Sequence, residues 1–498
     1  MVLEAFLDAL RNFWSVELWL FIMAGTIYGV IAGILPGVGG LVSLALFMPF
    51  IFLLSPEQAL PFMVAVGAVL CTGGSVTAIL LNVPGTTPNA ATLIDGYPMT
   101  QKGEAGRALG AGLSSSAIGG LITPLLALAI IPVLLFMLMA IHSADLVFLI
   151  LLGISCIAVL GRGSTIKGLV SAGVGFLLAF IGFQVGTGVA RFTFGSLYLY
   201  EGINLVPLAL GIFAVTEMVV LATRGGAIAK TPVTMERVSG VWQGVMDTLR
   251  RWKLVLRSSI IGFIVGVIPG IGGTVSSFIA YAQAKQTSKH PERFGTGFVD
   301  GVIAPESANN AKEGGALLCT LAIGIPGAPA MALILGAFLM LGLIPGPEML
   351  TLHLDLSLTL LMVIIVANVI GVAILLPLAS RLSKIALIPG SVLAPLVMVV
   401  IFMGTFIHRQ QFLDLIALLV FGLLGLVMMR YGYDRPVLLL AFILGSLFEK
   451  YLFIALKVGG LLFFLRPIAL TLIFIMIAIY SHEPIKRLIQ RRRGVKLG

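Results

Sequence analysis

The chain has 498 residues, of which 59% are hydrophobic and only 10% are charged, and its mean hydropathy is +1.11. A soluble domain of this composition would lack the polar groups needed to cover its surface, so soluble classes are excluded. The net charge of +10 comes from basic residues at helix ends and in a few loops, without the aromatic-interleaved basic surface of a nucleic-acid-binding protein.

The long apolar runs predict helices that span a lipid bilayer. A spanning helix needs roughly 20 apolar residues. Continuous runs of that kind exclude a barrel, so we expect an all-α integral membrane protein with about 10–12 transmembrane helices, surrounded by membrane lipid. Clear runs occur at 167–183, 203–222, 358–379, 411–429 and 461–480.

Charge near the ends of the runs predicts the topology. Residues 1–20 lack the basic start and the cleavage site of a secretory signal, which indicates a short interfacial helix. The segment 224–257 and the C-terminal tail are rich in lysine and arginine. The positive-inside rule therefore places both in the cytoplasm. Acidic residues dominate near the N-terminus, which favours the opposite side for that end.

An internal repeat is the most informative feature. GVIAGILPGVGG at 29–40 and GFIVGVIPGIGG at 262–273 share seven of twelve residues, and the other positions are apolar in both. Farther on, residues 73–88 resemble residues 315–330, and a Pro-Gly step occupies matched positions in the two segments. Two motifs recurring in one order indicate a duplicated transporter core, and we expect its halves to be inverted in the membrane.

The repeat divides the chain into parts with different expected roles. Residues 21–223 form the first repeat with its associated spans, and 258–350 form the core of the second. The basic cytoplasmic loop 224–257 separates them. Residues 351–498 are ordinary spans with a basic tail, which suits a scaffold or a homodimerisation unit.

Each copy of the PGxGG motif predicts a broken helix. Proline removes a backbone donor and glycine permits left-handed dihedral angles, so the apolar helix before each motif should end there. Broken backbone at membrane depth lines a site where carbonyls bind a cation and helix N-termini bind an anion. The alternative is a loop at the membrane surface, with the preceding glycines as packing faces. The motif positions are Pro36, Gly37, Gly39, Gly40, Pro269, Gly270, Gly272 and Gly273.

Polar residues beside the Pro-Gly steps are candidate ligands. Asn82, Thr86 and Thr87 surround the Pro84-Gly85 step, whose partner in the second half is Pro326-Gly327. Neutral amides and hydroxyls bind a carboxylate or a sodium ion without the desolvation cost of a buried charge. A polar turn between spans is the alternative. The whole segment 84–110 is expected to be unwound or a loop.

The most polar stretch of the chain, at 285–315, supplies the second group of candidates. Its PESANNA block contains Ser307, Asn309 and Asn310, which offer hard oxygen ligands or amide donors. The block is expected between helical segments, as part of the substrate path. The alternative is a solvated loop in which Glu306 caps the following helix.

The sequence gives little support for metal binding, ATP hydrolysis or catalysis. The three cysteines and five histidines lack metal-ligand spacing, no phosphate-binding loop for ATP occurs, and no catalytic constellation is evident. We therefore expect a protein that is not an enzyme and that uses no cofactor or metal, apart from Na+ as a coupling ion. A passive anion channel stays an alternative to a transporter, because broken helices permit both.

Four motifs occur in a fixed order along the chain: GILPGVGG, LLNVPGTTPNAATLIDGYP, VIPGIGGTVSSFIAYAQAK and FGTGFVDGVIAPESANNAKEGGALLCTLAIGIPG. Through these motifs the sequence resembles the large membrane subunit of tripartite tricarboxylate transporters, the TctA family. The resemblance implies a bacterial inner-membrane importer of a carboxylate, coupled to Na+ or H+ and related to elevator-type transporters. It implies two partners, a small four-span membrane subunit and a periplasmic solute-binding protein. It also implies that the PGxGG positions shape the site, with Asn82, Thr86, Thr87, Ser307, Asn309 and Asn310 as ligands.

Overall fold

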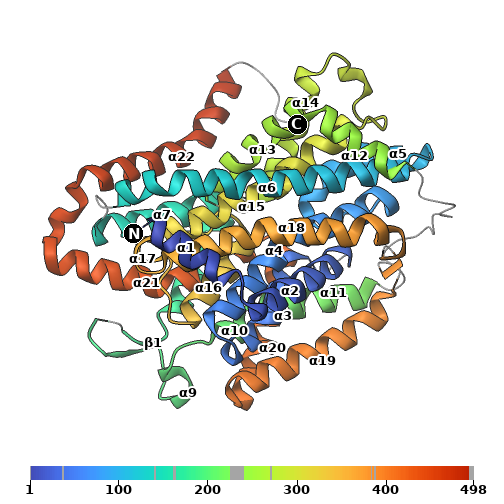
Figure 1. Ribbon diagram of the computed structural model, residues 1–498. Helices are drawn as coiled ribbons and strands as arrows, with labels where there is room; N and C mark the ends of the chain where they lie inside the picture. The colour runs from blue at the N-terminus through green and yellow to red at the C-terminus, as the bar shows by residue number, and fades with distance from the viewer. Residues whose placement is uncertain are drawn as a thin grey trace. The chain divides into compact units, whose positions relative to one another are not determined.

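A computed structural model describes residues 2–35, 39–138, 142–160, 164–184, 186–224, 240–269, 272–382, 384–385 and 388–492. These ranges are mainly helical (Figure 1). The strands found within them are β1 (Gly182–Phe183) and β2 (Ala190–Arg191), which pair antiparallel. The predicted all-α class is confirmed.

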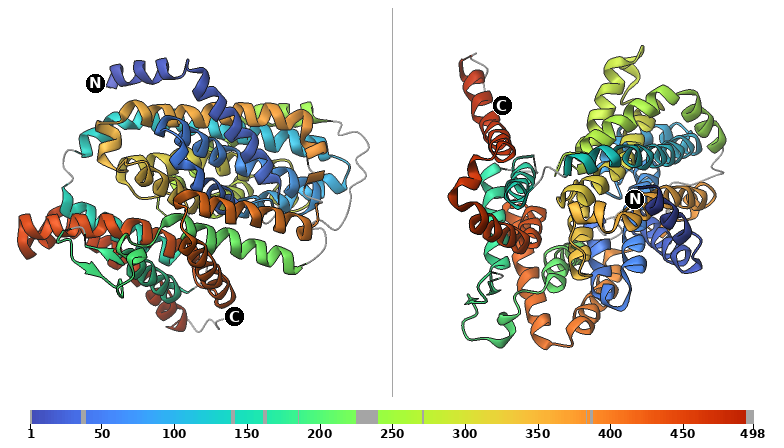
Figure 2. Two further views of the ribbon diagram at one scale, coloured as in Figure 1. Left: turned by 90° about the horizontal axis from the view of Figure 1, so that it is seen from below. Right: turned by 60° about the vertical axis from the view of Figure 1, so that its left-hand side comes forward.

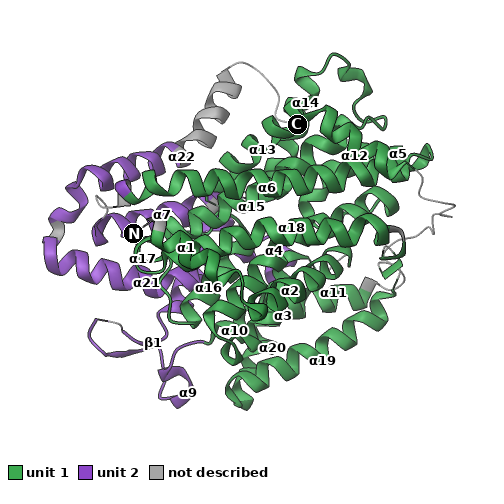
Figure 3. Ribbon diagram, viewed as in Figure 1, with its two compact units in different colours: residues 1–135, 204–426 green, residues 136–203, 427–498 purple. Residues whose placement is uncertain are grey.

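The chain forms two compact units, coloured separately in Figure 3: residues 1–135 with 204–426, and residues 136–203 with 427–498. The second unit contains β1 and β2, and an apolar core that includes Phe148, Ala455 and Phe463. Arg466, which lies between η6 and α22, forms an ion pair with the fully buried Asp145 of α7. Its helices are α7 (Ser143–Leu160), α8 (Thr165–Ala179), α9 (Leu197–Tyr200), α21 (Arg435–Gly459), η6 (Gly460–Leu465) and α22 (Pro467–Arg492).

The first unit contains both copies of the sequence repeat. Its first part consists of α1 (Val2–Asn12), α2 (Val16–Ile34), α3 (Gly40–Phe47), η1 (Met48–Leu53), α4 (Pro56–Leu81), η2 (Thr87–Asn89), α5 (Ala90–Gln101) and most of α6 (Ala105–Leu138). The second part begins with α10 (Leu205–Ala209), η3 (Leu210–Val215), α11 (Thr216–Arg224), α12 (Val241–Arg250), α13 (Trp252–Val267), α14 (Gly272–Thr287) and η4 (Pro291–Arg293). It continues with α15 (Asp300–Ile323), α16 (Pro329–Met340), α17 (Pro347–Thr351), α18 (Leu354–Leu382), α19 (Gly390–Arg409) and most of α20 (Phe412–Tyr431).

Eight of the described helical segments are long and apolar enough to span a membrane, and five shorter apolar segments accompany them. The long segments begin at residues 16, 56, 105, 205, 354, 390, 412 and 435. The short ones include Gly40–Leu53 and Pro329–Met340, which follow helix breaks in the two repeat copies. Eight is fewer than the expected total of about 10–12 spans, because other apolar runs, such as those at 167–183 and 461–480, form the shorter segments Thr165–Ala179 and Pro467–Ala478.

Helix α2 packs along α4, and α13 packs along α15 in the same way (Figures 1 and 2). At each crossing a glycine lies where an added Cβ would meet a main-chain carbonyl of the partner helix. The contacts are Gly29 with Val66 and Gly33 with Leu70 in the first pair, and Gly262 with Ala308 and Gly266 with Lys312 in the second. These residues occupy matched positions in the two repeats, so both copies have the same local packing. Their inversion across the membrane stays a prediction.

Contacts between the copies follow the same pattern. Helix α3 of the first copy packs against α16 of the second, and α14 of the second packs against η2 and α5 of the first. Helix α3 corresponds to α14 in the repeat, and η2 with α5 corresponds to α16, so the two contacts are equivalent. An interface of this kind is what two copies related by an approximate two-fold axis form.

Two expected loops are largely helical. In the segment 84–110 only a short connection precedes η2, and α5 and α6 follow. The PESANNA block lies inside the continuous helix α15, with Pro305 in its interior, so Glu306 is fully buried in mid-helix and caps nothing. Tertiary partners for its polar side chains explain why the helix forms there. In the basic segment, α12 and the start of α13 occupy the described residues, and 225–239 lie outside them.

The glycine crossings generate the first prediction. Replacing Gly33 or Gly266 by alanine should lower the free energy of unfolding by about 1–3 kcal/mol, because the added methyl group must push two helices apart. Thermal unfolding of the purified chain in detergent measures the change. Gly173→Ala on α8 is the matched control, since its Cβ would meet nothing within 4 Å. Equal melting temperatures for all three variants would contradict this account.

Candidate functional site

Both PGxGG motifs lie at interruptions of the helical backbone. Helix α2 ends at Ile34 and α3 begins at Gly40, while α13 ends at Val267 and α14 begins at Gly272. The helices therefore end where proline and glycine predict. Pro36, Gly37 and Gly270 lie outside the described residues, whereas Gly39, Gly40, Pro269, Gly272 and Gly273 lie within them.

A second pair of interruptions follows α4 and α15. Helix α4 ends in a left-handed residue, Asn82 with φ of 56°, and α15 ends in Gly324 with φ of 74°. Asparagine tolerates this conformation, so the exposed Asn82 has a backbone role at the helix end. Added Cβ atoms at Gly85 and Gly327 would clash with the carbonyls of Gly33 and Gly266. Each Pro-Gly step is thus fixed against the preceding broken helix.

Three helix starts meet beside one buried lysine. The hydroxyl of Thr274 in α14 donates to that of Thr87 in η2 over 3.2 Å. A Cβ on Gly272 would lie 3.4 Å from Pro329, the first residue of α16. On Gly273 it would clash with the stem of Lys312. The positive ends of these helices and the ammonium group together favour an anion.

Lys312 forms an ion pair with its neighbour Glu313, and both side chains are only 5% exposed. The Oε2 atom of Glu313 has no hydrogen-bond partner among the described residues. Sequence reasoning missed both groups. The repeat could have identified them, because Lys312 aligns with Leu70 and Glu313 aligns with Cys71. Charged residues thus occur in the second copy where the first copy has uncharged ones.

Glu306, nearly two turns earlier on α15, accepts hydrogen bonds from four neutral groups. Ser75 of α4 donates over 2.6 Å and Ser116 of α6 over 2.8 Å, both to Oε2. Asn89 donates over 3.2 Å and Thr92 also donates, both to Oε1. All five side chains are buried. The carboxylate is therefore the centre of a polar cluster, hereafter the Glu306 cluster.

The Glu306 cluster extends to the helix break through Asn89. Its Oδ1 atom accepts from both the main-chain N–H and the hydroxyl of Thr86, the buried residue that precedes η2. Its Nδ2 atom donates to Ser75 and to the Cys71 carbonyl, each over 3.0 Å. Asn89 thus links Glu306 to Thr86, which the sequence predicts as a ligand.

The other predicted ligands have different surroundings. The Ser307 hydroxyl donates to the Ile303 carbonyl of its own helix over 2.8 Å. Asn310 donates to Thr72 and to Asn368, each over 2.6 Å, and so joins α15 to α4 and α18. Asn309 is fully buried, and neither polar atom of its side chain has a hydrogen-bond partner among the described residues.

Asp95 connects the two polar segments that the sequence singles out. Its buried carboxylate accepts from the N–H groups of Gly295, Gly297 and Phe298 at 2.8–3.0 Å, and from the Tyr281 hydroxyl at 2.8 Å. A carboxylate held by several main-chain donors stabilises the connection that enters α15. Asp95 therefore positions the helix that carries the Glu306 cluster.

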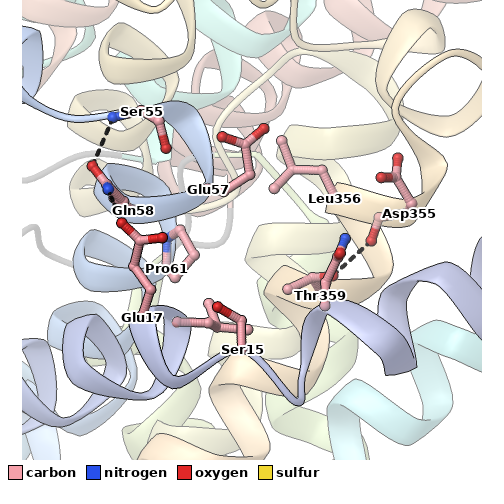
Figure 4. Close-up of a pocket in the computed structure, with 11 residues that line it drawn as sticks. Ser15, Glu17, Ser55, Glu57, Gln58, Pro61, Asp355, Leu356 and Thr359 are labelled. Carbon is pink, nitrogen blue, oxygen red and sulfur yellow. Dashed lines mark hydrogen bonds between the residues drawn. The ribbon is translucent and has the colours of Figure 1, made fainter.

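A separate cavity of about 380 Å³ lies at the starts of α2, α4 and α18 (Figure 4). Glu17, Glu57 and Asp355 line it, each in the first turn of its helix. Carboxylates are favourable at helix N-termini, which explains their placement. Three such groups repel an anion, so this cavity is a poor site for one.

Comparison with known proteins agrees with the broken-helix architecture. Residues 19–440 match the tripartite tricarboxylate transporter TctA family. An Agrobacterium vitis protein, named as an uncharacterized 52.8 kDa protein in the TAR-I ttuC' 3' region, is 36% identical over 463 residues, covering 92% of this chain and 91% of that protein. Another, named for the TAR-II ttuC' 3' region, is 36% identical over 215 residues, covering 43% and 89%. No solved structure matches the chain.

The Asp95 contacts generate the second prediction. Asp95→Asn should speed amide hydrogen exchange at Gly295, Gly297 and Phe298 by roughly ten- to a hundredfold, since hydrogen bonds to a charged group contribute about 1.5–3 kcal/mol. Exchange followed by mass spectrometry measures this. Glu104→Gln, which changes a carboxylate that is 44% exposed beyond α5, is the control. Unchanged exchange at 295–298 in Asp95→Asn would refute the positioning role.

Proposed function

The chain belongs to the tripartite tricarboxylate transporter TctA family, and we propose that it imports a tricarboxylate or a related organic carboxylate by symport with Na+ or H+. In this proposal it is the large membrane subunit of a binding-protein-dependent secondary transporter. It carries out no catalysis and needs no cofactor. The observation that carries the proposal is the meeting of three helix starts beside Lys312.

The helix starts suit a carboxylate for electrostatic reasons. Each N-terminus presents unpaired main-chain N–H groups and about half a positive charge. Thr86 and Thr87 add hydroxyl donors at η2, and Thr274 adds one at α14. A substrate with two or three carboxylates engages several of these groups at once. The number of converging donors thus supports a carboxylate with several charges as the substrate, and in this proposal the binding protein sets the preference among carboxylates.

The Lys312–Glu313 pair suits a site that must also be stable without substrate. Without substrate, Glu313 neutralises the lysine, so the site carries no net charge through the low-dielectric core. A substrate carboxylate takes the place of Glu313 as the partner of Lys312. The same helix break therefore serves the loaded and the empty states of a moving transport domain, as in an elevator mechanism.

The proposed partners and location are those that the family resemblance implies. A small four-span membrane subunit completes the membrane part, and a periplasmic solute-binding protein delivers the substrate. The chain resides in the bacterial inner membrane with its C-terminus in the cytoplasm. Uptake should require all three proteins. Uptake by the purified chain alone, at the rate of the whole complex, would contradict this arrangement.

A passive anion channel is the competing function, because broken helices also line channels. Proteoliposomes that contain the complete complex distinguish the two. A symporter accumulates labelled carboxylate above the external concentration when a Na+ or H+ gradient is imposed. Equilibration without accumulation would establish the channel.

The third prediction concerns Lys312. Lys312→Gln should weaken the apparent affinity for the carboxylate by roughly ten- to a hundredfold, because a charged hydrogen bond to substrate is lost. Uptake of labelled citrate and other tricarboxylates by cells that produce the complete complex measures this. Lys285→Gln, at an exposed lysine on α14, is the control.

A double variant separates binding from folding. Lys312→Gln alone leaves Glu313 buried and unpaired, which destabilises the protein. Lys312→Gln with Glu313→Gln removes both charges, so it should fold and still bind weakly. Normal affinity in the double variant would move the substrate site away from this helix break.

A further inference from the structure

Glu306 is a buried carboxylate that has no positive partner among the described residues. Its residue is fully buried, and no ion pair of Glu306 occurs among the residues that the structure describes. Hydrogen bonds from neutral groups stabilise the charge only partly, and an isolated buried charge costs several kcal/mol. A group of this kind inside a membrane protein requires either a proton or a bound cation.

The surroundings of Glu306 are rich in hard oxygen atoms. Three hydroxyls, from Ser75, Thr92 and Ser116, contact the two carboxylate oxygens and come from three different helices. The Cys71 carbonyl lies next to them, because its oxygen is 3.0 Å from the Ser75 hydroxyl oxygen and accepts from Asn89. A hydroxyl donates to a carboxylate when the site is empty, and it offers a lone pair when a cation enters. The set therefore matches the oxygen ligands that alkali cations take.

The number of carboxylates and hydroxyls in the Glu306 cluster favours a bound monovalent cation. One carboxylate neutralises a single positive charge, which disfavours a divalent ion. A proton on Glu306 would engage only one of the neighbouring hydroxyls, whereas a cation takes oxygen ligands from all three. Asn309, one turn farther along α15, adds a buried amide whose oxygen and nitrogen have no partner among the described residues. Buried polar groups of this kind normally have a ligand, an ion or water beside them.

From these contacts we infer that the Glu306 cluster is a sodium site, with Glu306, Ser75, Thr92 and Ser116 as its side-chain ligands. Its role as the coupling site rests on the proposed function, because Asn89 joins Glu306 to Thr86 at the carboxylate-binding helix break. Sodium draws the carboxylate and hydroxyl oxygens onto itself and releases Asn89. The freed amide then orients Thr86 for the substrate. By linkage, substrate and sodium each raise the affinity of the other.

Sodium binding is measured first without substrate. The full chain is purified in detergent, and its unfolding temperature is followed as NaCl replaces choline chloride at constant ionic strength. A ligand that binds only the folded state raises this temperature with its concentration. The wild-type chain should show a saturable rise. Glu306→Gln should abolish it, and Ser116→Ala should shift the half-saturating Na+ concentration about tenfold upward.

Ser115→Ala is the matched control for Ser116→Ala. The two serines are adjacent, both are fully buried, and the Ser115 hydroxyl donates to the Gly112 carbonyl of its own helix. Its Na+ dependence should equal that of the wild type. If Glu306→Gln does not fold, the comparison of the two serine variants still decides the question.

Three results would overturn the inference: a wild-type chain that Na+ does not stabilise, a Glu306→Gln chain that keeps the Na+ effect, or stabilisation that follows pH in choline chloride instead of Na+. The last result would make Glu306 a proton site. Since no carboxylate is present, failure of the proposed transport function would leave the Na+ effect intact. Loss of carboxylate uptake with an intact Na+ effect would thus count against the function alone.

Discussion

Close approach of helix main chains at glycine is the constraint on which the rest of the repeat core depends. At the crossings of α2 with α4 and α13 with α15, partner carbonyls lie where any side chain would be. In a bilayer, apolar side chains gain little by leaving lipid, so close van der Waals packing of backbones provides much of the association energy. These crossings also fix the ends of α2 and α13 against Gly85 and Gly327. The helix breaks are thereby held in place from both sides.

Polar groups in the interior are arranged so that each charge has a specific environment. Asp95 has main-chain donors, Lys312 has Glu313, and Glu306 has hydroxyls and an amide. The hydrogen bonds of Asp95 are complete and stabilise the connection that enters α15. The other two lie beside the helix breaks, where an anion and a cation would complete them. This division separates the structural carboxylate from the groups assigned to transport.

The two repeat copies share a backbone design but differ in chemistry. Matched glycines and matched helix ends give both copies the same crossings, whereas Lys312 and Glu313 replace Leu70 and Cys71. Two copies with the same backbone packing therefore differ in charge, because the buried ion pair occurs in the second copy alone among the described residues.

The sequence by itself determined the membrane class, the repeat and the positions of the helix breaks. Those features depend on local properties: apolar length, loss of backbone donors at proline, and conformational freedom at glycine. It did not determine that the PESANNA block is helical or that Glu306 is buried. Tertiary structure decided both, because Ser75, Asn89, Thr92 and Ser116 come from distant segments to satisfy Glu306. Without those partners a stretch so polar would remain in water, and its composition alone therefore could not exclude a solvated loop.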